Sequence, residues 1–185
     1  MNTNRTIYDI VFACSSPGTL ARFSRTCRGS YDAVNSFNRC AFNINQHLSR
    51  FIDDPIGFRS MQAQTGTLIS GSNALQFLDR TLYENSDLDL YVHDLYRYEV
   101  GAFLQEHGYV FMPNERQDAR FGGPEYLRYG TTNLYKRNTE ANDYNMQGVA
   151  AVFNFWKEGS STHKIQLITA THSPLEIILN FHSCA

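Results

Sequence analysis

Two aspartates one residue apart, Asp87 and Asp89, are the side chains in this sequence best suited to chemistry. They lie in the run "SDLDLYV", in which polar and apolar residues alternate as they do in a half-buried β-strand. The strand period of two predicts both carboxylates on one face of a sheet, with Leu88, Leu90 and Val92 on the other. Carboxylates this close either raise each other's pKa or hold a cation, and oxygen ligands suit Mg²⁺ or Mn²⁺. The open alternative is two solvated charges at an exposed strand end.

A Gly-Ser step, Gly71-Ser72, precedes the two aspartates and follows the apolar run "TLI". Glycine after a strand lets the backbone approach a ligand closely. The first amides of a following helix, together with the Ser72 hydroxyl, would offer hydrogen-bond donors to a phosphate. The two features together predict a site for ATP or another nucleoside triphosphate with its metal. An ordinary helix start with a serine cap remains the alternative for the Gly-Ser step.

The elements that must position these residues are short strands separated by helices. Alternating β-branched or aromatic runs occur at "TLIS", "DLDLYV", "GVAAVFNFW" and "HKIQLIT". The helix expected after "TLIS" has four apolar residues on one face: Ala74, Leu75, Leu78 and Leu82. A second amphipathic helix is expected in "DLYRYEVGAFLQEHG", with Gly108 ending it. This order predicts an α+β fold with a mixed β-sheet flanked by helices over residues 66–185.

The later part of the chain predicts a β-hairpin in "VAAVFNFWKEGSSTHKIQLI", with its turn at residues 158–161. We expect Phe153, Phe155 and Trp156 to form the core of this hairpin. The preceding segment, residues 112–147, is polar and rich in turn-forming residues. It is longer than a usual connection, so we expect a strand or two within it, at "EYLRYG" and "TNLYKR".

Residues 1–65 have helical rather than strand periodicity. A serine cap and an early proline in "SSPGTLARFSRTC" predict a helix start, and Pro55 separates two further short helices. The chain is therefore expected to consist of a helical N-terminal region, residues 1–65, and an α/β domain, residues 66–185.

Composition narrows the class of protein. The chain has 185 residues, 42% of them hydrophobic, and a formal net charge of −2. Its 16 basic residues are scattered, which does not support a nucleic-acid-binding surface. No apolar run is long enough to span a bilayer, and Asp9 interrupts the segment where a signal peptide would have its apolar core. We therefore expect a cytoplasmic or nuclear protein with no membrane partner.

The stretch "SGSNALQFLDRTLYENSDLDLYV" resembles the signature of the nucleotidyltransferase superfamily, which includes DNA polymerase β, poly(A) polymerases and the antibiotic nucleotidyltransferases. In that family the Gly-Ser step binds the triphosphate and the two aspartates hold metal. The resemblance implies that Gly71 and Ser72 bind phosphate and that Asp87 and Asp89 are metal ligands and catalytic residues. It spans residues 66–170 and is most specific at 68–92. It also implies transfer of a nucleotidyl group to an acceptor, which could be protein, RNA or a small molecule.

The same family has a third carboxylate on a later strand, which helps to bind metal and accepts the proton of the attacking hydroxyl. In "HKIQLIT" the residue at that position is Gln166. A glutamine can neither accept the proton nor add negative charge. Glu84, Glu158 and His163 are the candidates to replace the missing acid. If none does, the chain binds nucleotide without turnover or binds none.

The N-terminal stretch "SSPGTLARFSRTCRGSYDAV" resembles the middle of an F-box. The whole arrangement is similar to a group of fungal proteins that have a degenerate F-box-like region before this module. The resemblance implies an alternative function, in which a catalytically inactive nucleotidyltransferase fold recruits a protein partner through its N-terminal helices.

Overall fold

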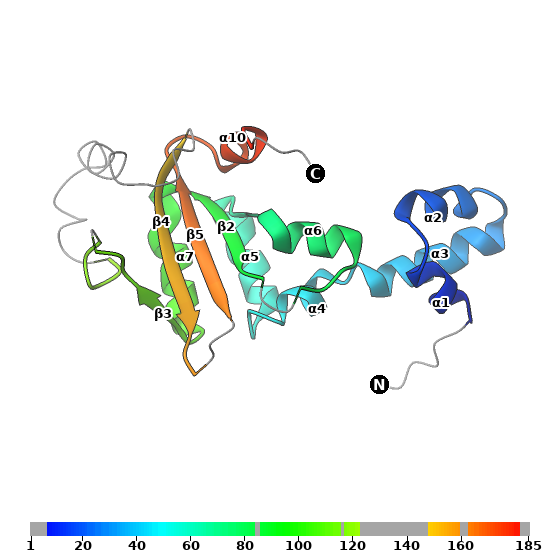
Figure 1. Cartoon of the computed structure of the whole chain (residues 1–185), viewed down its shortest axis with the longest axis horizontal. Helices are drawn as coiled ribbons and strands as arrows, with labels where there is room; N and C mark the ends of the chain where they lie inside the picture. Colours follow the sequence, from blue (N-terminus) through cyan, green and yellow to red (C-terminus); the bar gives the residue numbers. More distant parts are fainter. Residues whose placement is uncertain (1–6, 84–85, 116, 123–147, 160–162, 182–185) are drawn as a thin grey trace.

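The computed structural model describes residues 7–83, 86–115, 117–122, 148–159 and 163–181. The molecule is elongated, with three helices at one end and a β-sheet at the other (Figure 1). Between these ends lie α4 (Ile44–Leu48), α5 (Pro55–Thr65) and α6 (Gly71–Asp79). The chain is thus a mixed α/β structure, as the sequence predicts. In the described part, no helix is both long enough and apolar enough to cross a lipid bilayer.

The three terminal helices are α1 (Ile7–Ala13), α2 (Pro17–Ser24) and α3 (Arg28–Ala41). The predicted start of α2 is confirmed, because Ser16 Oγ accepts a hydrogen bond from the Thr19 amide at 3.1 Å and Pro17 is the first helical residue. A small core holds the three helices together, formed by Phe12, Leu20 and Val34.

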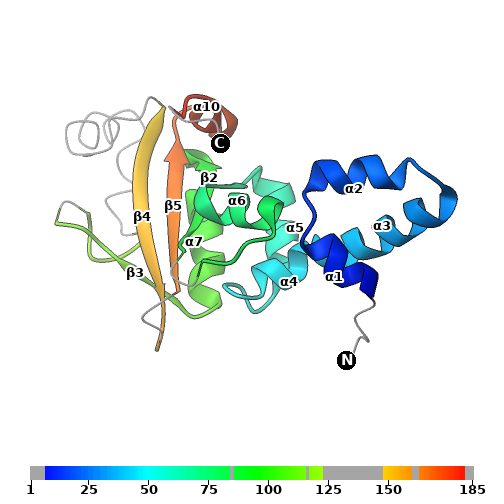
Figure 2. The ribbon, with the colours of Figure 1, turned by 45° about the vertical axis from the view of Figure 1, so that its right-hand side comes forward.

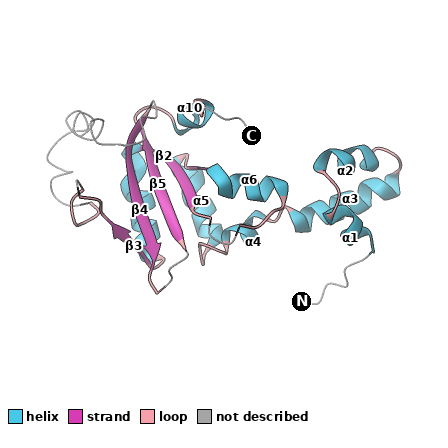
Figure 3. Ribbon diagram, viewed as in Figure 1, coloured by secondary structure: helices cyan, strands magenta, loops and turns pink. Residues whose placement is uncertain are grey.

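The sheet has five strands in the order β1-β2-β5-β4-β3. Figure 3 shows β2, β5, β4 and β3 side by side in this order. Their bounds are β1 Leu68–Ser70, β2 Leu88–His93, β3 Tyr109–Met112, β4 Val149–Lys157 and β5 Lys164–Ala170. Strands β2 and β5 are parallel, and the other neighbouring pairs are antiparallel. The antiparallel β4–β5 pair confirms the hairpin predicted from the sequence.

One face of the sheet forms the main core. The alternating residues Leu88, Leu90 and Val92 of β2 are buried there, as predicted. They pack with α4, α5 and α7 (Arg97–Glu106), which follows the short 3₁₀ helix Asp94–Tyr96. Figure 2 shows α5 and α7 on the same side of the strands. Helices α4 and α5, although they belong to the predicted N-terminal region, therefore share their core with the sheet.

Among the described residues, the opposite face of the sheet is covered at one end only. There Tyr91 and Ile168 pack with Ile177 of the short helix α10 (Pro174–Leu179). The rest of this face, which we call the open face, has a row of polar residues in register across four strands: Ser70, Asp89, Gln166 and Asn154. The open face therefore contains the aspartates singled out in the sequence.

The structure differs from the sequence predictions at one strand and one side chain, and two predicted strands lie outside the described residues. The strand β3 was not predicted, although its alternating burial has the strand period. Trp156 does not join the core with Phe153 and Phe155, because the period of two turns it to the open face. The strands expected at "EYLRYG" and "TNLYKR" lie outside the described residues.

The apolar stripe of α6 also differs from what its spacing suggests. Leu75, Leu78 and Leu82 are exposed, whereas Asn73 and Gln76 are fully buried. The buried amides have partners that an aliphatic side chain could not replace. Gln76 Oε1 accepts from the Tyr83 amide at 2.8 Å, and Asn73 Oδ1 lies 2.9 Å from His47 Nε2. One long-range hydrogen bond and one to the turn after α6 therefore hold the polar side of the helix inward.

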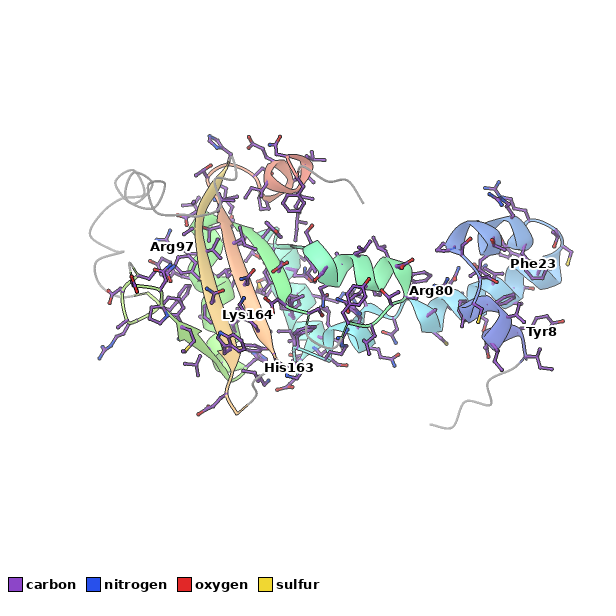
Figure 4. All side chains as sticks on the ribbon, viewed as in Figure 1. Tyr8, Phe23, Arg80, Arg97, His163 and Lys164 are labelled. Atoms are coloured by element: carbon purple, nitrogen blue, oxygen red, sulfur yellow. The ribbon has the colours of Figure 1, made fainter. Side chains whose placement is uncertain are left out.

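Arg80 joins the end of α6 to the N-terminal helices (Figure 4). Its guanidinium donates to the carbonyl oxygens of Phe12 and Ser15 and lies over the rings of Phe37 and Phe42. Arg80 is also the one non-glycine residue with positive φ among the described residues, at 57°. The left-handed conformation turns the chain so that one side chain reaches all four partners.

We predict that Arg80→Ala weakens the attachment of the N-terminal helices, because it removes two hydrogen bonds to carbonyls and two cation–π contacts. The expected loss is about 2 kcal/mol of unfolding free energy, measured by urea denaturation, with faster proteolysis near residue 15. Arg22→Ala, an exposed arginine on α2, is the matched control and should change neither quantity. Equal effects of the two substitutions would contradict the role given to Arg80.

Candidate active site

The turn from β1 into α6 forms the first half of the candidate site. Ser70 is the N-cap in an extended conformation, and Gly71 follows as the first helical residue with φ of 72°. Among the described residues, Ser70 makes no side-chain hydrogen bond that caps the helix, and Ser72 is the second helical residue, so the step is a helix start without a serine cap. Ser72 is exposed in the first turn. The amides at this helix start are therefore available to an external acceptor.

Asp89 on β2 forms the second half, directly beside this turn. Its Cα is in register with that of Ser70 on the antiparallel strand β1. A Cβ added to Gly71 would lie 2.2 Å from Asp89 Oδ2, much closer than any real contact. Two features therefore favour glycine at residue 71: its positive φ, and the carboxylate of Asp89, which a Cβ would displace. Gly71 and Asp89, 18 residues apart in the sequence, are therefore in contact.

Lys164 on β5 supplies a positive charge next to the two aspartates. Its Nζ lies 2.9 Å from Asp87 Oδ2, an ion pair between strands that are 77 residues apart in sequence. Both side chains are partly exposed, so the pair itself contributes little to stability. Lys164 matters electrostatically, because its positive charge compensates the negative charge of Asp87.

Gln166, the residue at the position of the third acid, lies beside Asp89 in the parallel β2–β5 pair. In one orientation of its amide, Nε2 donates to Asn154 Oδ1 at 3.1 Å. In the other, Nε2 donates to Asp89 Oδ1 at 3.2 Å and Oε1 accepts from Lys164 Nζ at 2.8 Å. In the second orientation Gln166 bridges Asp89 and Lys164. An acid at residue 166 would instead repel Asp89 and neutralise Lys164.

The electrostatic environment raises the pKa of Asp89 to about 6. Burial of the carboxylate is the main cause, and the negative charge of Asp87 adds to it, while Lys164 acts in the opposite direction. Burial, and to a smaller extent the negative charge of Asp89, raise the pKa of Tyr91 to about 12. The ionised form of Asp89 is therefore unfavourable, and a proton or cation that binds to it on the open face lowers this cost.

The donor set fits a magnesium or manganese ion bound through few protein ligands. Asp87 and Asp89 offer carboxylate oxygens on one face, and Gln166 and Asn154 add amide oxygens. In the described part of the chain, no group of three or more His, Cys, Asp or Glu side chains could hold a metal. Mg²⁺ commonly uses one or two carboxylates and takes its remaining ligands from water and phosphate. The two aspartates meet that requirement when a phosphate is present.

The residues proposed to replace the missing acid do not gather at the site where they are described. His163 contacts the ring of Phe51, with ring centroids 5.8 Å apart, and so faces the core side of the sheet. Glu158 is exposed beyond the end of β4. Glu84 lies outside the described residues.

Two residues of the site, Lys164 and Asn154, were not assigned a role from the sequence. The period of two in "KIQ" indicates that Lys164 shares a face with Gln166. It does not indicate that β5 pairs with β2, which is what brings the lysine to Asp87. Comparison of the chain with models of protein families, with curated proteins and with solved structures gave no match.

We predict that Gly71→Ala destabilises the protein more than Gly66→Ala. Both glycines have positive φ, 72° and 65°, but a Cβ at residue 66 meets nothing within 4 Å. Gly66→Ala should cost about 1 kcal/mol of unfolding free energy from backbone strain alone. Gly71→Ala should cost at least about 2 kcal/mol, because Asp89 must also move. Urea denaturation of both variants measures the difference, and equal losses would contradict the close Gly71–Asp89 contact.

The raised pKa of Asp89 predicts a pH-dependent effect of Asp89→Asn. Because the pKa is higher in the folded state than in the unfolded state, the ionised carboxylate lowers stability above about pH 6, and this cost disappears as the pH falls below about 4. Asp89→Asn should therefore stabilise the protein by about 1–3 kcal/mol at pH 7 and by little at pH 4. Urea denaturation at both pH values measures it. Asp32→Asn, at an exposed site on α3, is the control and should show no such difference.

Proposed function

We propose that this protein binds a nucleoside triphosphate together with Mg²⁺ or Mn²⁺ at the β1–α6 turn and the Asp87–Asp89 pair. The observation that supports the proposal best is the contact between Asp89 and Gly71, which allows no side chain between the helix start and the carboxylate. A phosphate at the α6 amides would lie beside two carboxylates. Such a phosphate needs a cation between itself and the aspartates, which is the arrangement of a metal–triphosphate complex.

Each residue has a separate part in this proposal. The amides of Gly71 and Ser72, with the Ser72 hydroxyl, bind phosphate oxygens at the positive end of α6. Asp87 and Asp89 bind the cation, which when bound neutralises charge on the triphosphate and aligns the α-phosphate. Lys164, whose partly exposed side chain pairs with Asp87, would supply a positive charge beside the bound phosphates.

In the described part of the chain, the site lacks a group needed for transfer of the nucleotide to an acceptor. Deprotonation of an attacking hydroxyl needs a base, and the amide of Gln166 cannot act as one. Asp89 has a pKa near neutrality, but it is also the proposed cation ligand and cannot hold a proton at the same time. We therefore expect binding with slow or no nucleotidyl transfer to protein, RNA or a small molecule.

A second candidate, a catalytically inactive module that recruits a protein partner, is favoured by the N-terminal helix. Four large apolar side chains on α1 have exposed fractions above one half: Ile7 80%, Tyr8 62%, Ile10 57% and Val11 54%. Figure 4 shows Tyr8 and Phe23 at the end of the molecule far from the sheet. Exposed apolar surface of this kind is typical of interaction sites. The two candidates are compatible, since the exposed side chains of α1 and the β1–α6 turn belong to different parts of the molecule (Figure 1).

We predict that calorimetric titration of the protein with ATP and Mg²⁺ shows binding that the double variant Asp87→Asn/Asp89→Asn loses by at least about tenfold, about 1.4 kcal/mol. The physical reason is the loss of both carboxylate ligands of the cation. Asp79→Asn, an exposed change at the far end of α6, is the matched control and should bind normally. No binding by the wild type, or equal binding by the double variant, would overturn the proposal.

A further variant separates binding from transfer. Gln166→Glu adds a carboxylate beside Asp89 and should tighten the binding of Mn²⁺ in the presence of ATP. If the wild type binds ATP but labels no acceptor, and Gln166→Glu gains measurable label transfer, the missing acid limits catalysis. Transfer by the wild type that the aspartate substitutions abolish would instead show that the chain is an active nucleotidyltransferase.

A further inference from the structure

The open face continues beyond the aspartates towards an aromatic side chain. Trp156 on β4 is in register with Lys164, and Val110 on β3 is in register with Trp156. Because Phe153 and Phe155 point to the core, the period of two directs Trp156 to the open face, where it is partly exposed. Among the described residues, no aromatic ring packs against it.

The surroundings of Trp156 are apolar on the side away from the charges. Val110 and Met112, both on β3, are 46% and 53% exposed. On the other side lies Lys164, which contacts Asp87. The open face therefore changes across three strands from two carboxylates, through one cation, to a partly exposed indole flanked by aliphatic side chains.

We propose that Trp156, with Val110 and Met112, forms a stacking platform for the nucleobase of the nucleotide bound at the β1–α6 turn. The inference rests on the proposed function and names the part of the ligand that the aspartates do not contact. Aromatic side chains stack with every base through its π-face, and stacking tolerates differences in base identity. The platform therefore favours nucleoside triphosphates over inorganic polyphosphates without selecting one base strongly.

The geometry of the sheet allows one nucleotide to reach both sites. Neighbouring strands lie about 4.8 Å apart, so Trp156 on β4 is roughly 10 Å from β2, which holds the aspartates. A ribose with its first phosphates spans such a distance. Lys164 on the intervening strand β5 lies along this path, where its cation can contact the phosphates.

In the described part of the chain, two other directions on the open face offer no exposed apolar surface to a base. Towards the far end of the strands, Tyr91 and Ile168 are covered by Ile177 of α10. Beyond Ser70, the sheet ends at β1 and the chain enters α6. The platform on β4 and β3 is therefore the part of this face that remains for an apolar ring.

Trp156 is the single tryptophan of the chain, so intrinsic tryptophan emission reports on this side chain alone. Titration of the full chain with ATP and Mg²⁺ should quench the emission. Tripolyphosphate with Mg²⁺ should bind the wild type at least tenfold more weakly and without quenching. By calorimetry, Trp156→Leu should weaken ATP binding at least tenfold and leave tripolyphosphate binding unchanged, whereas Trp156→Phe should keep most of the ATP affinity.

The outcomes distinguish this inference from the proposed function. If ATP and tripolyphosphate bind the wild type equally, or Trp156→Leu binds ATP normally while Asp87→Asn/Asp89→Asn does not, the platform is wrong and the phosphate–metal site stands. If the wild type binds neither ligand, the proposed function fails and the platform fails with it. Should Trp156→Leu not fold, as judged by circular dichroism, the ligand comparison on the wild type and Trp156→Phe decides.

Discussion

The candidate site depends on the packing of one carboxylate, that of Asp89, against the first residue of a helix. The contact requires glycine at residue 71 and removes the carboxylate from much of its water. Loss of water makes the ionised form costly, which is why the pKa of Asp89 rises and why a cation or proton is favoured beside it. Lys164 and Gln166 on the neighbouring strand compensate part of the negative charge of the two aspartates. The proposed metal ion would compensate the remainder.

The remainder of the fold holds these two elements in place and keeps their surface accessible. Helices α4, α5 and α7 bury one face of the sheet, so the core side of β2 is packed where the strand carries Asp89. On the opposite face α10 covers only one end of the strands. The covered end and the N-terminal helices lie outside the polar row, so in the described part of the chain β5, β4 and β3 stay uncovered beside the aspartates.

Much of the fold followed from local patterns, and the failures have identifiable causes. Period two located β2, β5 and the hairpin, but β3 is short and directly follows Gly108, where the sequence suggests only the end of a helix. The stripe Leu75–Leu78 suggested a buried face for α6, whereas Asn73 and Gln76 are the buried side chains, with hydrogen bonds to His47 and to the Tyr83 amide. Periodicity cannot weigh such tertiary bonds against burial of leucine.

The sequence by itself determined that Asp87 and Asp89 share a face and that a Gly-Ser turn precedes them, because alternation and turn chemistry are local properties of the chain. It also placed Gln166 where the resemblance implies an acid. Only the tertiary structure decided that β5 pairs in parallel with β2 and so brings Lys164 to Asp87 from 77 residues away. The order and register of strands depend on non-local packing of the whole sheet, which no short stretch of sequence encodes.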